Sequence, residues 1–546
     1  MRRCRALSLL TLIWLLGACG SWQPRRTGEV RELPLRTRRT MHADLITMAE
    51  NWDAMSRGRA RSRREAENAY ETALGRFLTT WTRAQSPRSW SSGLTLGLEG
   101  PGGHFVIEFD AVDAKKRGAS PAEYDDLMPA ETTIWRGRET QALRPGLGVP
   151  LVGRVERNEA SARDQPFLPP KGGHFTVTAV MEMMPPAADG MRHCRLRLHN
   201  SLNTETVPAP GGERQLAADY TAPKELSLSK KAFGNLSLIG ILNPERAFKD
   251  CRLYCMDEYD PKRIPIVFVH GLMSDPHIWL NAVNAISSDS TLRRHYQPWY
   301  FLYPTAIAVP QAAAKLREAL LLAREHYDPE HDDPGMQRMV LVGHSMGGLI
   351  SRMQVTDSGE ALWSSVFTKP LTELKISQTA RDSLQQTLIV KPLPFAQRVI
   401  FIATPHRGSR IASLDIVRRL TGLIRVPFES MTMAGELLQG NSDALSPQIS
   451  QWGVFSFLSL GTLSERSPFL RGLDQTRPAV RHHSIIGNSG LKWLDREKTS
   501  DGVVPYRSAH LDSASSEKMV PYLHGCSDKQ DVVREITRIL HEHLRQ

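Results

Sequence analysis

The C-terminal half of the chain is predicted to adopt an α/β fold with a mostly parallel sheet. Three apolar runs, at 264–270, 338–343 and 396–405, have the length and composition of buried strands. A helical pattern between the first two places Leu316 and Leu320 on one face. Because strands that alternate with helices form parallel βαβ units, we expect a ligand site beyond the carboxyl ends of these strands.

Length and charge limit the possible classes of protein. With 546 residues the chain exceeds one ordinary domain, so two or more domains are expected. The formal net charge of +11 is spread widely, with dense arginine clusters only at Arg25–Arg39 and Arg57–Arg64. The sequence has no interleaved aromatic and basic motif of the nucleic-acid modules, so no nucleic-acid partner is predicted. Attraction to anionic lipid headgroups suits this charge better.

The first residues are predicted to be a targeting segment. Met1–Arg5 is basic, and Leu7–Leu16 is mostly apolar but too short to span a bilayer. The next residues, up to Cys19, resemble the lipobox of bacterial lipoproteins, which implies cleavage before Cys19 and acylation of that cysteine. An ordinary secretory signal is the alternative. With Gly20 after the cysteine, the resemblance implies a lipid-anchored envelope protein, in the outer membrane and facing the periplasm of a Gram-negative bacterium.

No catalytic motif is found before residue 259. After the signal peptide (1–18), residues 19–40 are rich in Arg, Pro and Thr and lack hydrophobic periodicity, so we expect a tether. Residues 41–258 are expected to form a separate α+β region of unknown role, with a helical hairpin followed by short strands. The apolar stripes of the hairpin are attributed to packing and contain Leu45, Met48, Trp52, Met55, Tyr70, Leu74, Phe77, Leu78 and Trp81.

The cysteines after Cys19 indicate no metal site. The spacing of Cys251 and Cys255 differs from the CxxC form, and no histidine ligand lies near them. In an exported chain one or two disulfides are possible. The four residues concerned are Cys194, Cys251, Cys255 and Cys526.

The motif Gly343-His-Ser345-Met-Gly347 lies between a predicted strand and a predicted helix, which is the context of a nucleophile elbow. On this motif, residues 260–546 resemble the α/β-hydrolase superfamily, and within it the serine esterases and lipases. The resemblance implies an α/β-hydrolase fold with flanking helices over 259–546 and Ser345 as the nucleophile. It requires no metal or organic cofactor.

A serine nucleophile needs a histidine base and a carboxylate that orients the base. In the superfamily these follow in the order Ser, Asp or Glu, His. The stretch Thr499–Pro505 is similar to the acid-bearing turn of lipases, so Asp501 is assigned as the acid. Asp495 and Glu497 are the alternatives.

The assigned base is His524, in a loop just before the last helical pattern, where the superfamily places its histidine. His510 is the alternative, in a segment that resembles another strand or its edge. The oxyanion donors are assigned to the backbone N–H groups of Met346 and, by resemblance, of Leu272, with Met273 possible. The other two histidines near these motifs, His270 and His344, are expected to be structural.

An insertion at about 407–480 is expected to form a cap over the site, and a smaller one spans 357–391. The apolar content of the larger one favours acyl chains or other hydrophobic esters as substrates. We therefore predict a serine carboxylester hydrolase of lipase or esterase type. An acyltransferase or phospholipase with the same three residues, or a binding lipoprotein without catalysis, are the alternatives.

Overall fold

The computed structural model describes most of the chain from residue 33 onward. Residues 1–32, which contain the predicted signal peptide and Cys19, lie outside the described part. The structure describes residues 33–57, 59–84, 95–111, 124–132, 141–188, 190–229, 251–304, 307–409, 428–489 and 496–546.

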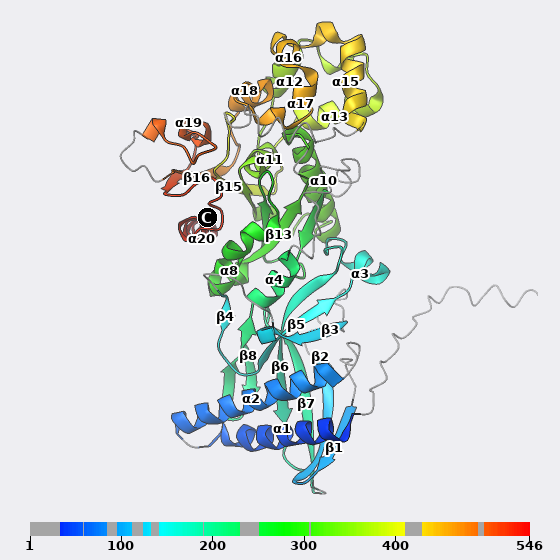
Figure 1. Ribbon diagram of the computed structural model, residues 1–546, viewed down its shortest axis with the longest axis vertical. Helices are drawn as coiled ribbons and strands as arrows, with labels where there is room; N and C mark the ends of the chain where they lie inside the picture. The colour runs from blue at the N-terminus through cyan, green and yellow to red at the C-terminus, as the bar shows by residue number, and fades with distance from the viewer. Residues whose placement is uncertain are drawn as a thin grey trace, which may run out of the picture.

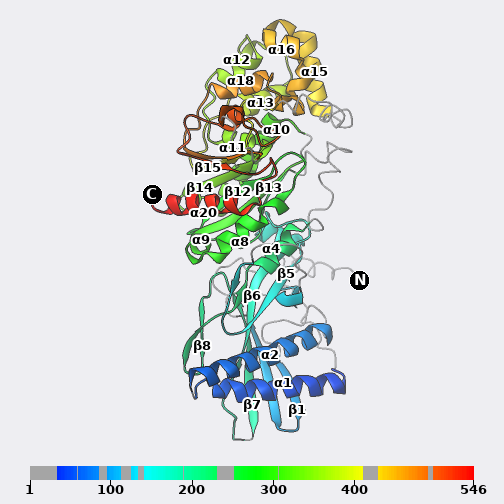
Figure 2. The same cartoon turned by 60° about the vertical axis from the view of Figure 1, so that its left-hand side comes forward.

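The molecule is elongated, with two regions stacked along its long axis (Figure 1). We call residues 33–229 the N-terminal region and residues 251–546 the C-terminal region. A helical hairpin lies at one end of the long axis, and the helices of residues 428–474 lie at the other (Figures 1 and 2). Among the described residues, no helix combines the length and apolar character needed to cross a bilayer.

The hairpin consists of α1 (Leu35–Ala54) and α2 (Ala60–Ala84). Its apolar stripes are buried, and they pack with one face of a six-stranded sheet into a single hydrophobic cluster. Since α1 begins at Leu35, the predicted tether 19–40 extends too far. The Arg- and Thr-rich start of α1 has no apolar stripe of its own, but it continues a helix whose next turns are anchored by Met41 and Leu45.

The sheet of the N-terminal region has the strand order β1-β2-β7-β6-β5-β3. Its neighbouring strands are antiparallel except β2 and β7, which are parallel. The strands are β1 (Thr95–Gly100), β2 (Gly103–Ala111), β3 (Asp126–Pro129), β5 (Val149–Val155), β6 (Gly173–Met183) and β7 (Met191–Asn200). Shorter elements complete the region: β4 (Leu143–Arg144), α3 (Glu159–Asp164), β8 (Thr206–Ala209), β9 (Gly212–Gln215), β10 (Ala218–Asp219) and α4 (Thr221–Leu228).

The C-terminal region contains a seven-stranded sheet with the order β11-β13-β12-β14-β15-β16-β17. All neighbouring pairs are parallel except β11 with β13. This confirms the predicted α/β fold, and the arrangement fits an α/β hydrolase. The strands are β11 (Arg252–Cys255), β12 (Ile264–Val269), β13 (Tyr296–Leu302), β14 (Met339–His344), β15 (Ala396–Ile402), β16 (Arg481–Gly487) and β17 (Ser516–Val520).

Helices cover both faces of this sheet. One face packs against α10 (Val309–Tyr327) and α11 (Met346–Gln354), and the other against α8 (Leu280–Ser288) and α20 (Gln530–Leu544). The predicted boundary between 258 and 259 is wrong, because β11 already belongs to this sheet. Only four residues long and beginning with an exposed arginine, β11 lacks the apolar run that marks a buried strand.

The insertion (residues 407–480) leaves the sheet after β15 and is helical where it is described. Its helices pack against those of the smaller insertion, and Phe367 pairs with Leu445 in an isolated bridge. The helices are α12 (Ala361–Val366) and α13 (Gln378–Leu388) of the smaller insertion, and α15 (Phe428–Gly440), α16 (Pro447–Trp452), α17 (Val454–Phe457) and α18 (Pro468–Asp474) of the larger. The remaining α-helices of the C-terminal region are α9 (Ser290–His295) and α19 (Tyr506–Ala509).

The end of the insertion is tied to α11 by a buried arginine. The guanidinium of Arg352 donates hydrogen bonds to the carbonyl oxygens of Leu473 (2.8 Å) and Thr476 (2.9 Å). Arg407, at the start of the insertion, donates to Asp474 at 3.0 Å. These bonds fix α18 against the helix that starts beside Ser345.

Candidate active site

Ser345 lies in a sharp turn between β14 and α11. Its backbone has φ 54° and ψ −124°, a strained conformation for a residue other than glycine. A Cβ on Gly347 would lie 2.3 Å from the carbonyl oxygen of Val269, so the turn can pack against β12 only if this residue is a glycine. The turn holds the serine at the carboxyl end of the sheet, next to the positive end of α11.

The structure brings together the three side chains that the sequence selected. The Ser345 hydroxyl is 2.8 Å from Nε2 of His524, and Nδ1 of His524 is 2.7 Å from Oδ2 of Asp501. If Nδ1 donates to the carboxylate, Nε2 has a free electron pair for the serine proton. This geometry suits proton transfer from Ser345 to His524.

A tight turn holds the carboxylate of Asp501. Its Oδ1 accepts hydrogen bonds from the backbone N–H groups of Val503 (2.8 Å) and Val504 (2.6 Å). The His524 N–H donates to the Asp501 carbonyl oxygen at 3.0 Å, which joins the two loops directly. A Cβ on Gly487 would lie 2.7 Å from Cβ of Asp501, so the end of β16 fits closely against the acid. The side chain of Asp501 is thus fixed on three sides.

His344 supports the loop that carries His524. Its Nε2–H donates to the His524 carbonyl oxygen at 2.8 Å. Its Nδ1 is buried and has no hydrogen-bond partner among the described residues. Burial, together with the nearby charge of His524, lowers the pKa of His344 to about 4. His344 therefore stays neutral at pH 7, where it acts as a hydrogen-bond donor.

The loop after β12 lies against the nucleophile, as an oxyanion donor requires. A Cβ on Gly271 would be 3.0 Å from Cβ of Ser345. Leu272 follows at the edge of the site, and Met273 is 66% exposed with φ 56°. His270 stacks on Tyr303, whose hydroxyl donates to the His270 carbonyl oxygen at 2.8 Å. Burial lowers the pKa of His270 to about 4, and its contacts hold this loop.

The alternative residues lie elsewhere or outside the described part. His510 follows α19 instead of lying in or beside a strand, because the strand β17 begins only at Ser516. Its Nδ1 is 2.5 Å from the Glu517 carboxylate, and its Nε2 is 2.9 Å from Asp512. Glu497 is exposed, and Asp495 lies outside the described residues. None of the four cysteines considered for disulfides is bonded to another cysteine in the structure.

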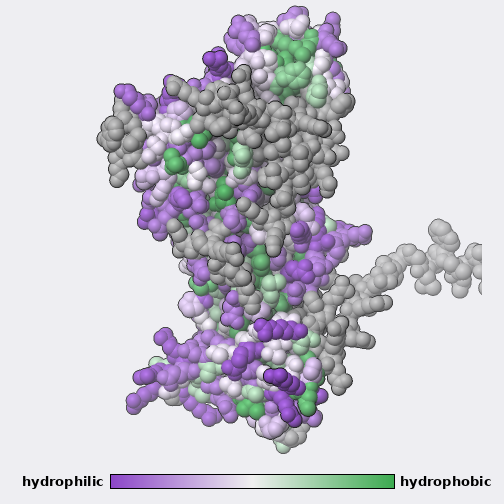
Figure 3. Space-filling model, viewed as in Figure 1, coloured by the Kyte–Doolittle hydropathy of each residue, from purple (hydrophilic) through white to green (hydrophobic). Residues whose placement is uncertain are grey.

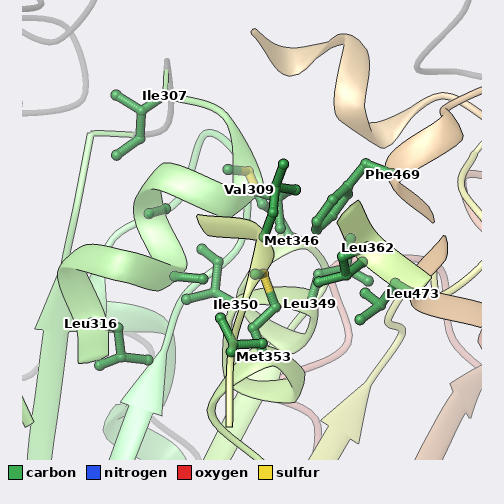
Figure 4. Close-up of a cluster of buried hydrophobic side chains, with 14 of the residues drawn as sticks. Ile307, Val309, Leu316, Met346, Leu349, Ile350, Met353, Leu362, Phe469 and Leu473 are labelled. Carbon is green, nitrogen blue, oxygen red and sulfur yellow. The ribbon is translucent and has the colours of Figure 1, made fainter. Parts of the chain in front are cut away.

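Apolar side chains form one wall beside Ser345. Figure 4 shows Met346, which directly follows the serine, with Val309 on one side and Phe469 on the other. All three are fully buried, and they come from α11, α10 and α18. The insertion therefore contributes directly to this wall through Phe469.

One group of carboxylates could hold a cation. In the described part of the chain, oxygen atoms of Asp328, Asp332 and Asp333 lie within 4.8 Å of one another. Asp328 accepts hydrogen bonds from the backbone N–H groups of Asp332 and Asp333, and Tyr259 donates to Asp333. Protein donors thus already bond to the carboxylates of Asp328 and Asp333. The group precedes β14 and lies at the opposite end of that strand from Ser345.

Solved structures similar to this one include lipases and esterases. The mature lipase BlEst2 of Bacillus licheniformis matches 53% of this chain and 97% of its own, with 19% identity and a TM-score of 0.31. The metagenomic carboxyl esterase MGS0156 matches 54% of this chain and 83% of its own, with 15% identity and a TM-score of 0.29. Phospholipase PlaB of Legionella pneumophila matches 45% of each chain, with 16% identity and a TM-score of 0.27.

At this level of similarity, nothing about substrate or mechanism is carried over from these proteins. No protein-family model and no curated protein matches the sequence. Conclusions about chemistry therefore depend on the geometry of the site itself.

Proposed function

We propose that the protein is a serine carboxylester hydrolase of lipase or esterase type. The observation that carries this proposal is the hydrogen-bonded chain from Ser345 through His524 to Asp501. A buried carboxylate, an imidazole and a hydroxyl in this order form the arrangement that activates a serine for acyl transfer.

In the proposed reaction, His524 takes the hydroxyl proton as Ser345 attacks the ester carbonyl. Asp501 keeps the imidazole in the required tautomer and stabilises its positive charge. The backbone N–H groups of Met346 and Leu272 are proposed to stabilise the oxyanion, each by about 2.7–4 kcal/mol. The alcohol leaves with the proton from His524, and water then releases the acyl group by the same steps in reverse order.

The substrate is proposed to be a hydrophobic ester. Met346 directly follows Ser345 and packs beside Val309 and Phe469, and we propose that the acyl chain of a Ser345 ester extends along this apolar side. Exposed apolar side chains occur farther out, on α15 (Met431, Leu438), and Figure 3 shows a hydrophobic area at that end of the molecule.

A fluorophosphonate probe tests the nucleophile, with hydrolysis of short- and long-chain p-nitrophenyl esters measured in parallel. Ser345→Ala should abolish labelling and lower turnover by about a millionfold, and His524→Ala should have a similar effect on turnover. His510→Ala is the matched control, because His510 also pairs with a carboxylate, and it should keep full activity. If folded wild-type protein neither labels nor hydrolyses any ester, with or without detergent, the proposal is wrong.

We also propose that Cys19 anchors the chain in the cell envelope, on the basis of its lipobox-like sequence. Cells grown with radiolabelled palmitate should label the protein, and Cys19→Ser should remove the label. Labelling that persists in the variant would overturn this proposal.

A further inference from the structure

Five arginines gather at the turn between α1 and α2, where the hairpin ends. All five are exposed, and Arg61 has a side chain that is 93% exposed. Of these five arginines, only Arg61 forms an ion pair with a described residue, Glu65, at 3.2 Å. Figure 3 shows a hydrophilic surface at this end of the hairpin. We call this group the arginine tip; it consists of Arg57, Arg59, Arg61, Arg63 and Arg64.

The arginine tip does not help the hairpin to fold. Arg61, Arg63 and Arg64 lie in the first turns of α2, which has no acidic residue in its first turn. The N-terminus of a helix carries a partial positive charge, so arginines there are unfavourable. Arg59 and Arg63 are also four residues apart, a spacing at which like charges repel. An anionic partner would reverse both effects.

A second element adds charge to the same place. The turn between β8 and β9 contacts the hairpin end, because a Cβ on Gly211 would lie 3.5 Å from Cα of Ser56. The same position lies 3.8 Å from the guanidinium of Arg214. Arg214 therefore extends the arginine tip from an independent part of the chain.

We propose that the arginine tip binds the surface of an anionic phospholipid bilayer. Guanidinium groups bind phosphate oxygens in pairs, and several of them on a protruding end can reach a flat surface together. A nucleic-acid partner fits less well, since residues 56–65 contain no aromatic side chain that could stack on a base. A single acyl chain anchors weakly, so a basic surface of this kind would strengthen a lipid anchor.

The arginine tip is separate from the candidate active site. The hairpin and the insertion occupy opposite ends of the long axis, and Ser345 belongs to the C-terminal region (Figure 1). Changes at the tip should therefore alter membrane binding without altering hydrolysis of a soluble ester. This makes the inference independent of the proposed function.

The test compares the full chain with and without the tip charges, in a Cys19→Ser background that cannot be acylated. Binding is measured by co-sedimentation with vesicles of phosphatidylcholine alone or mixed with phosphatidylglycerol. Each arginine near an anionic membrane contributes about fivefold to binding, so removal of four should weaken binding to the mixed vesicles by roughly several hundredfold at low salt. The tip variant combines Arg57→Gln, Arg59→Gln, Arg63→Gln and Arg64→Gln.

A matched variant removes the same net charge from exposed arginines of the C-terminal region. It should bind mixed vesicles nearly as the parent does, and it combines Arg466→Gln, Arg477→Gln, Arg481→Gln and Arg545→Gln. Hydrolysis of p-nitrophenyl butyrate and the melting temperature serve as checks on folding. Equal loss in both variants, or unchanged binding in the tip variant, would overturn the inference. So would tip-dependent binding of duplex DNA that is tighter than binding of the mixed vesicles at the same salt concentration.

Discussion

The Nε2 atom of His344 lies 2.8 Å from the carbonyl oxygen of His524, although the two residues are 180 positions apart in the chain. The residue before the nucleophile thus holds the backbone of the residue that faces the nucleophile. The adjacent residues His344 and Ser345 therefore position both partners of the Ser345–His524 hydrogen bond. If this short segment moves, Ser345 and His524 should move together.

Replacement of His344 by leucine is predicted to lower kcat by about tenfold to a hundredfold, because a small displacement of His524 misaligns proton transfer. His344→Gln should recover part of the loss, since its amide can donate to the same carbonyl oxygen. Steady-state kinetics with p-nitrophenyl butyrate measures both. A leucine variant as active as the wild type would show that this hydrogen bond does not position the base.

Gly487→Ala is predicted to lower activity although it replaces none of the three reacting residues. The new methyl group would lie 2.7 Å from Cβ of Asp501 and 2.9 Å from the carbonyl oxygen of Tyr522, so the acid must move. Loss of its alignment should cost about a hundredfold in kcat. Gly525→Ala is the control next to His524, because nothing lies within 4 Å of its added Cβ. Equal activity of both variants would contradict the prediction.

The ion pair between Lys224 of α4 and Asp257 is buried where the two regions meet. Lys224→Met would leave the carboxylate buried and unpaired, and should lower the free energy of unfolding by about 3–5 kcal/mol. Lys224→Met combined with Asp257→Leu should regain most of this. Urea unfolding measures all three chains.

The exposed pair of Lys391 and Asp357 provides the comparison for this cycle. Lys391→Met should change the free energy of unfolding by less than about 1 kcal/mol, because water screens an exposed pair. If Lys224→Met costs no more than Lys391→Met, the buried pair does not stabilise the junction.

Acid is predicted to destabilise the folded chain through its buried histidines. Burial lowers the pKa of His174, His270, His344 and His483 to about 4 and that of His543 to about 3, against an ordinary value of about 6.5. Below about pH 6.5 the unfolded chain takes up protons that the folded chain refuses, so the free energy of unfolding falls with pH down to about 4.

Urea unfolding at a series of pH values tests this prediction. The stability should be greatest near neutral pH and decline on the acid side, and His543→Asn should make the decline less steep. A stability that is flat across this interval would show that the histidines titrate alike in both states.

The sequence was sufficient to predict the strands that are buried along most of their length. The strands β12, β14 and β15 are covered on both faces, so each contains a run of apolar residues that stands out from its surroundings. The edge strands β11 and β17 are short and contain exposed charged residues, Arg252 and Lys518. Their pairing comes from contact with a neighbouring strand, which no local pattern reports.

A similar division applies to the candidate site. Ser345 has a local motif, Asp501 lies in a stretch similar to the acid-bearing turn of lipases, and His524 lies in a loop just before the last helical pattern, so order and position sufficed to select them. The bond from His344 to His524 and the pair of Lys224 with Asp257 join distant parts of the chain. Charged and polar residues are usually exposed, so only the tertiary structure shows that these are buried and paired.

The attachment of α18 through Arg352 has a mechanical consequence for the insertion. The hydrogen bonds from the Arg352 guanidinium attach α18 to α11, so the two helices should move together. They thereby keep Phe469 at a fixed position relative to Ser345. The helices α15, α16 and α17 show no such bond to α11 in the described part of the chain. These three helices are therefore attached to α11 less directly than α18 is. We expect a bulky substrate to enter by displacing α15, α16 and α17. The apolar side chains of Met346, Val309 and Phe469, proposed to contact its acyl chain, should keep their positions.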